Sequence, residues 1–206
     1  MNLIQVLGLA FGTAWTSGIN LYATVAVMGL LQHFRLAHLP GGLHVLDNWW
    51  IIGIALALYV IEFVADKIPY VDTVWDAIHT FIRVPAGAVM AAAATSDINP
   101  TVQVVALLVG GGLALATHGS KATLRASANV SPEPFSNWLL SLFEDIIAVA
   151  AALLAVFHPL IILMIIGIFL LILAWVLPKV VRRIKRMLAT VRSFFGRGTS
   201  ALPSPR

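Results

Sequence analysis

The chain has 206 residues, of which 60% are hydrophobic and only 11% are charged, whereas an average soluble domain is about 45–50% apolar and about 25% charged. A soluble fold of this size cannot bury that much apolar surface or cover it with so few charges. The composition therefore excludes a soluble enzyme, a nucleic-acid-binding domain and a secreted disulfide scaffold. It predicts an integral membrane protein with several spans.

Six apolar segments follow one another along the chain; the first is longer than a simple span, and the other five are close to the about 20 residues that cross a bilayer core. They cover residues 2–31, 49–65, 75–96, 102–126, 136–157 and 160–178. We therefore predict an all-α fold, a polytopic transmembrane helix bundle of about six spans that occupies residues 1–178.

The first segment is too long for a simple upright span. Its length corresponds to about 45 Å of helix at about 1.5 Å per residue, and its middle, Thr13 to Asn20, is polar and small. The sequence predicts a tilted helix or two half-helices, with Ser17, Gly18 and Asn20 as the residues of the break. A broken helix offers free backbone groups for an ion or anion, whereas close helix packing through Gly18 and Gly29 explains the same residues.

The C-terminal segment is strongly basic. Lys179 to Arg206 carries +8 with no acidic residue, while residues 1–178 carry −4. Apolar residues recur at helical spacing in 179–197, which predicts an amphipathic interfacial helix on anionic lipid headgroups, followed by a disordered tail at 198–206. Because basic residues favour the cytoplasmic side, we expect a cytoplasmic C-terminus and, with six spans, a cytoplasmic N-terminus.

Ionisable side chains inside or at the edges of the spans are the most informative feature. A charge at the centre of a membrane helix costs about 2.5–3.5 kcal/mol on insertion scales, so such groups pair or face water. We predict that they line a polar cavity or pathway. The set comprises Glu62, Asp66, Lys67, Asp72, Asp76, Arg83, Lys121, Arg125, Glu144 and Asp145.

Helical spacing and depth assign partners within this set. The expected pairs are Arg83 with Glu144 or Asp145, and Lys121 and Arg125 with Glu62 and Asp66. Buried ion pairs can also serve only to hold helices together, so a purely structural role stays open.

Metal and enzyme chemistry are less favoured. The histidines His33, His38 and His44 share one loop without regular spacing, so we predict interfacial loop residues and no metal site. The usual nucleotide-binding and hydrolase motifs are missing, and no cofactor is predicted. The carboxylates that could hold Mg²⁺ for chemistry on a lipid phosphate are Asp66, Asp72 and Asp76.

Several short motifs together resemble a known family. They are residues 17–24, 62–69, 72–76, 81–83, 118–122, Arg125 and 131–134. Over about residues 8–178 the chain resembles the bacterial membrane family catalogued as Domain of Unknown Function 4126. The resemblance implies an integral protein of the bacterial inner membrane, and it implies no substrate because the family has no assigned activity.

The sequence thus favours a transporter or channel that moves a small solute or ion through a charged cavity. Mixed charge slightly favours a zwitterionic or anionic ligand over a bare cation. A lipid-phosphate enzyme with a carboxylate-bound metal and a non-catalytic membrane scaffold are the alternatives. The expected partners are anionic lipid at the C-terminal helix and an unknown small solute; nucleic acid is not expected, and a homo-oligomer is left open.

Overall fold

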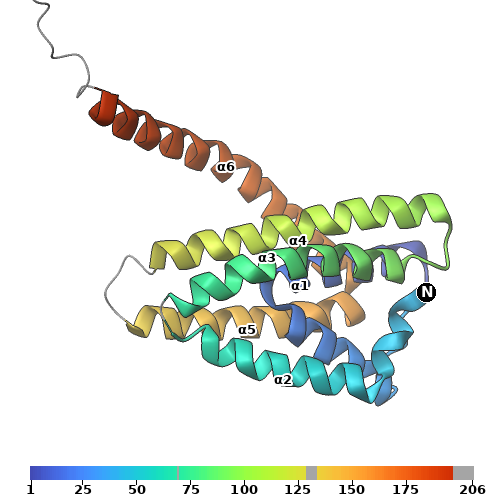
Figure 1. Ribbon diagram of the computed structural model, residues 1–206. Coiled ribbons are helices and arrows are strands. Elements are labelled where there is room, and N and C mark those ends of the chain that lie inside the picture. The colour runs from blue at the N-terminus through green and yellow to red at the C-terminus, as the bar shows by residue number, and fades with distance from the viewer. Residues whose placement is uncertain (69, 129–133, 197–206) are drawn as a thin grey trace, which may run out of the picture. The chain divides into compact units, whose positions relative to one another are not determined.

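The computed structural model describes residues 1–68, 70–128 and 134–196. Helices account for 89% of the chain, and the described residues contain no strand, which confirms the all-α prediction. The elements are α1 (Leu3–His33), the short 3₁₀-helix η1 (Gly41–Asp47), α2 (Trp49–Ala65), α3 (Val71–Ala94), α4 (Pro100–Ala128), α5 (Pro134–Phe157) and α6 (Pro159–Gly196) (Figure 1). The predicted disordered tail at 198–206 and the family motif at 131–133 lie outside the described residues.

Several of these helices are long and apolar enough to cross a membrane. Five qualify by length and composition, or up to six if η1 and α2, bent by 77° relative to each other, count as one span. The chain is thus a multi-pass membrane protein, as its composition predicts.

The chain divides into two compact units, Met1–Met164 and Ile165–Arg206. We predicted a change of structure after Pro178, but Pro178 lies inside α6, which continues to Gly196. A proline within a helix removes one backbone hydrogen bond without always ending the helix. The interfacial position of residues 179–197 remains a prediction.

The first unit is built around α1. This helix packs against α2, α3, α4, α5 and η1, and 78% of its apolar window is buried, against 28–39% for α3, α4 and α5. Glycines allow the close approach, since a Cβ added at Gly18 would lie 2.6 Å from the Ala114 carbonyl oxygen. Such small residues are typical of helix contacts in membranes, where backbones approach closely.

The helices around α1 define two ends of this bundle. We call the end with the α2–α3 and α4–α5 connections the charged end, and the opposite one the far end. Asp66, just after α2, and Glu144, early in α5, both bind the Arg125 guanidinium near the end of α4. Since these three segments meet at the charged end, α2 begins and α5 finishes at the far end.

Both ends of α1 lie at the far end of the bundle. A Cβ at Gly8 would lie 2.8 Å from the Pro159 carbonyl oxygen, where α6 begins, and a Cβ at Gly29 would lie 2.7 Å from Ile52 in the first turn of α2. Between them, Asn20 has φ −147° and ψ 102°, which is not helical. Figure 1 shows α1 entering the bundle, turning and returning toward η1.

This re-entrant path corrects the predicted topology. A topology of six simple spans makes the first segment a crossing and puts residue 1 and the loop after residue 31 on opposite faces of the membrane. In the structure both lie at the far end, because the break at Asn20 reverses the chain inside the bundle. Hydropathy could not show this, since the halves on either side of the break are both apolar.

Candidate functional site

Nine charged side chains are buried together in the half of the bundle nearest the charged end. We call them the charged network: Glu62, Asp66, Asp72, Asp76, Arg83, Lys121, Arg125, Glu144 and Asp145. None is more than 8% exposed. All nine belong to the ten ionisable residues singled out in the sequence.

Helical spacing explains how the network is assembled. Buried polar residues lie three, four or seven positions apart, so they form a single stripe on the inner face of each helix. On α3 the stripe is Asp72, Asp76, His79 and Arg83, and on α4 it is His118, Lys121 and Arg125. The helices therefore turn their apolar residues outward and their charges inward.

Arg83 is completely buried between α2 and α4. Its guanidinium donates to Glu62 Oε1 at 2.7 Å, Asp76 Oδ1 at 3.1 Å and His118 Nδ1 at 3.1 Å. The predicted pairing of Arg83 with Glu144 or Asp145 is wrong. Glu144 instead binds Arg125, and Asp145 accepts the Asn20 amide. The position of each residue along its helix predicted a similar depth in the membrane for these groups, but it could not show which helices are neighbours.

The Lys121 ammonium lies at the centre of the network, against oxygens from α1, α2, α3, α5 and the turn after α2. We call these five oxygens the oxygen cage: Ile19 O at 3.1 Å, Asp66 Oδ2 at 3.3 Å, Glu144 Oε2 at 3.5 Å, Glu62 Oε1 at 3.6 Å and Asp76 Oδ1 at 3.9 Å. The predicted pairing of Lys121 with Glu62 and Asp66 is confirmed.

Arg125 joins the turn after α2 to α5. It donates to Asp66 Oδ2 at 2.7 Å and to the Asp66 carbonyl oxygen at 2.9 Å, and it forms a close ion pair with Glu144. Asp72 Oδ2 lies 3.7 Å from the same guanidinium. The predicted pairing of Arg125 with Asp66 is confirmed.

The break in α1 is built by Asn20. Its Oδ1 accepts the Ala23 N–H at 2.9 Å, as a helix N-cap does. That N–H would otherwise bond the Ile19 carbonyl oxygen four residues earlier, so this oxygen is left to accept the Lys121 ammonium. The Asn20 amide donates to Asp145 Oδ1 at 3.0 Å. One residue thus ends one helix, starts another and contacts the network.

The other predicted residues lie beside the network. Ser17 and Gly18 keep helical geometry; Ser17 Oγ donates to the Ala14 carbonyl oxygen at 2.7 Å, and Gly18 serves close packing. Lys67 lies at the rim, with its ammonium 2.9 Å from the centre of the Phe63 ring. Partial burial lowers the pKa of Lys67, and the nearby Asp145 charge opposes that shift.

Two buried histidines extend the network, and the sequence analysis did not single out His79. Its Nδ1 donates to the Trp75 carbonyl oxygen at 2.7 Å, so its Nε2 accepts the Tyr22 hydroxyl at 2.9 Å. His118 accepts from Arg83, which can only donate, and is therefore neutral in this arrangement. The available signal for His79 was its position three residues after Asp76 on the inner stripe.

The network holds more negative than positive charge. Six carboxyl groups face three cations, so the nine residues carry a formal charge of −3 when every carboxyl group is ionised and the histidines are neutral. Within the described part of the chain, five buried carboxylate oxygens accept no hydrogen bond: Glu62 Oε2, Asp66 Oδ1, Asp76 Oδ2, Glu144 Oε1 and Asp145 Oδ2. Such acceptors are costly to bury unpaired. The formal charge of this cluster is therefore negative.

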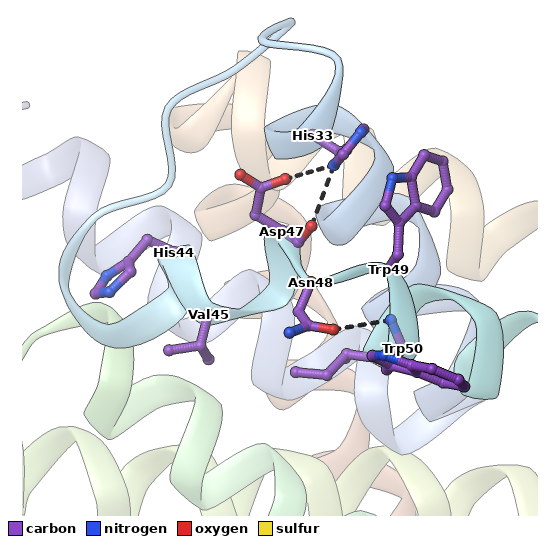
Figure 2. A pocket seen from close by; sticks show the side chains of 8 residues that line it. His33, His44, Val45, Asp47, Asn48, Trp49 and Trp50 are labelled. Atoms are coloured by element: carbon purple, nitrogen blue, oxygen red, sulfur yellow. Dashed lines mark hydrogen bonds and ion pairs between the residues drawn. The ribbon is translucent and has the colours of Figure 1, made fainter.

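The loop histidines lie at the far end. His33 Nδ1 is 2.7 Å from Asp47 Oδ1, and these residues line a shallow pocket of about 710 Å³ with His44, Trp49 and Trp50 (Figure 2). Within residues 1–68, 70–128 and 134–196, no three His, Asp or Glu side chains are arranged to hold a metal ion. The carboxylates named for a Mg²⁺ site instead contact arginine or lysine, as described above.

Comparison with known proteins identifies the family of this chain. The family model described as Domain of unknown function (DUF4126) matches residues 7–179, close to the range of the sequence motifs. No curated protein and no solved structure matches the chain. The match covers most of the chain and all nine residues of the charged network, so the chain belongs to the DUF4126 family.

Proposed function

We propose that this protein is a membrane transporter or channel that moves a small solute or ion through the charged network. The observation that carries this proposal is the position of Asp145. Among the described residues this buried carboxylate is held by the Asn20 amide and not by a cation within 4.0 Å. It lies beside the break in α1. A protein built only for stability would need neither a buried carboxylate without a cation nor a broken helix next to it.

The broken helix supports the proposal because its two halves place opposite partial charges in the network. The first half ends at Ile19, whose carbonyl oxygen accepts the Lys121 ammonium, and the second half begins at Asn20 with the positive end of its dipole. Lys121 complements the first and Asp145 the second. Discontinuous helices use such ends to bind ions and substrates in many transporters.

Within this proposal, Asp145 takes up the coupling proton or cation. The remaining carboxylates form an acidic wall, and Arg83 and Arg125 hold that wall in place through hydrogen bonds of 2.7 Å. Ion pairs serving assembly alone would be expected to balance in charge. The excess of three carboxylates favours a site that exchanges charge.

We propose an inner-membrane location with the charged end on the cytoplasmic side, because Lys67 lies at that end and the basic C-terminal segment favours the same compartment. The far end, and with it the N-terminus, is then extracytoplasmic. This replaces the cytoplasmic N-terminus expected from six simple spans. Residues 179–196 would lie on anionic headgroups of the cytoplasmic leaflet.

Counterflow in proteoliposomes tests transport. We would measure uptake of labelled methylammonium, glycine and acetate, and of protons with an internal pH dye. We expect uptake of at least one probe above protein-free vesicles and a loss of about tenfold or more in Asp145→Asn. Asp47→Asn, an exposed carboxylate at the far end, is the matched control. Probe uptake that stays equal in wild type and Asp145→Asn contradicts the proposal.

A further inference from the structure

We infer that the solute is a small cation with N–H donors, ammonium or a primary alkylammonium, and that it binds in the oxygen cage around Lys121. This inference rests on the proposed transport function and names its substrate class. Lys121 is then a resident cation, which fills the cage in this state and leaves it when the solute enters. The ligand and Lys121 share one chemistry, a tetrahedral ammonium surrounded by oxygens.

The geometry of the oxygen cage fits an ammonium ion. Its five oxygens lie 3.1–3.9 Å from Nζ and come from five different segments of the chain. Divalent cations are bound by oxygens at about 2.0–2.6 Å, whereas N⁺–H groups donate at about 2.7–2.9 Å and share acceptors over longer distances. The cage is therefore wide enough for an ammonium head.

Lys121 is held less tightly than its basic neighbours. Arg83 and Arg125 each donate at 2.7 Å to a carboxylate, and both make at least two further polar contacts. The closest oxygen to Lys121 Nζ is at 3.1 Å, and the closest carboxylate oxygen is at 3.3 Å. Of the three network cations, Lys121 is thus the one whose place a free cation can take at least cost.

The charge balance admits such an exchange. Even with Lys121 in the cage, five carboxylate oxygens of the network accept no hydrogen bond from the described residues, and the formal charge of the network stays negative. Four of these oxygens are the second oxygens of the cage carboxylates, and the charge of those carboxylates would attract an entering ammonium and repel an anion. The Ile19 carbonyl oxygen adds a neutral acceptor that faces the cage because Asn20 breaks α1.

The test is uptake of labelled methylammonium into proteoliposomes, with unlabelled competitors. We expect saturable uptake that ammonium inhibits and tetramethylammonium, which has the same charge but no N–H donor, does not. Uptake of glycine or acetate without methylammonium would overturn the cation assignment and leave transport standing. Uptake of no probe at all would instead count against the proposed transport itself.

Binding to Lys121→Ala separates the site from transport. This variant empties the cage of its own ammonium, so methylammonium should raise its thermal unfolding temperature at a concentration about tenfold lower than in wild type. Lys179→Ala, outside the network, should respond as wild type does. No stabilisation of Lys121→Ala beyond that given by tetramethylammonium would overturn the inference. If Lys121→Ala does not fold, the competition assay on wild type decides.

Discussion

The Lys121 ammonium lies 3.1 Å from the carbonyl oxygen of Ile19, although 102 residues separate them in the chain. This contact joins α4 to the end of the first half of α1. It exists because the Asn20 side chain takes the Ala23 N–H that Ile19 would bind in a continuous helix. The break in α1 and the charged network are therefore parts of one arrangement.

Substitutions at Asn20 test how this arrangement is held. Asn20→Ala removes the cap of the second half-helix and should cost about 1 kcal/mol of stability from the cap alone. Asn20→Asp keeps an acceptor for Ala23 but places a second carboxylate against Asp145, 3.0 Å from the present amide nitrogen.

Two carboxylates this close share a proton, and like charge opposes ionisation of both. Asn20→Asp should therefore be unstable at neutral pH and recover toward wild type as the pH falls, whereas the loss in Asn20→Ala should change little with pH. Thermal unfolding in detergent between about pH 4.5 and 8 measures both variants, a window that lies above ordinary carboxylate pKa values and covers raised ones. A loss in Asn20→Asp that does not depend on pH would mean that the side chain does not face Asp145.

A double-mutant cycle tests the partners of Arg83. Arg83→Met removes the closest cation from the buried Glu62 and Asp76, leaving them the more distant Lys121, and should cost about 3–5 kcal/mol. Glu62→Met added to Arg83→Met should recover part of this loss, a coupling of about 0.5–3 kcal/mol. Glu144, which pairs with Arg125 instead, should couple to Arg83 more weakly. Unfolding in increasing denaturant gives the values, and a stronger coupling to Glu144 than to Glu62 would restore the pairing expected from the sequence.

Paired glycine substitutions test the packing around α1. A Cβ at Gly18 would lie 2.6 Å from the Ala114 carbonyl oxygen and 2.8 Å from Thr117 Cβ, whereas a Cβ at Gly112 would meet nothing within 4 Å. Gly18→Ala should lower stability by about 1–3 kcal/mol, and Gly112→Ala should leave it unchanged or slightly higher. Equal effects at both positions in thermal unfolding would show that α1 does not approach α4 this closely.

The sequence predicted the helices and most of the network members. An ionisable residue in an apolar segment must pair or face water, because charge is costly in a membrane. The burial of these residues, and the pairing of Lys121 and Arg125 with Asp66, followed from that cost and from their helical spacing. The partner of Arg83 did not follow, because depth along a helix says nothing about which helices are neighbours.

The reversal of α1 was also beyond sequence reasoning. The polar stretch near Gly18 indicated a break, but a kinked span and a re-entrant hairpin have the same hydropathy. The deciding residue is a single Asn20 whose backbone leaves the helix. His79 was missed for a similar reason. Its spacing from Asp76 fits the inner face of α3, but its partner Tyr22 lies on α1 and is brought against it only by the fold.

Single-cysteine labelling tests the re-entrant path, and the cysteine-free chain gives no background. Asn2→Cys and Leu36→Cys lie at the two ends of α1 and should react with an impermeant maleimide from one side of the membrane. Ser127→Cys, near the end of α4, should react only from the other side. Labelling of the first two positions from opposite sides would show that α1 crosses the membrane.

Access of water-soluble cations to the charged network is the most direct test of the whole account. Ser141 is completely buried on α5, three and four residues before Glu144 and Asp145, and Ser141→Cys places a thiol beside the network. In membranes this thiol should react with the positively charged aminoethyl methanethiosulfonate faster than with its anionic sulfonatoethyl counterpart, while Ala155→Cys, also buried, should react with neither. A Ser141→Cys thiol as inert as that of Ala155→Cys would mean that the network is a closed set of structural ion pairs.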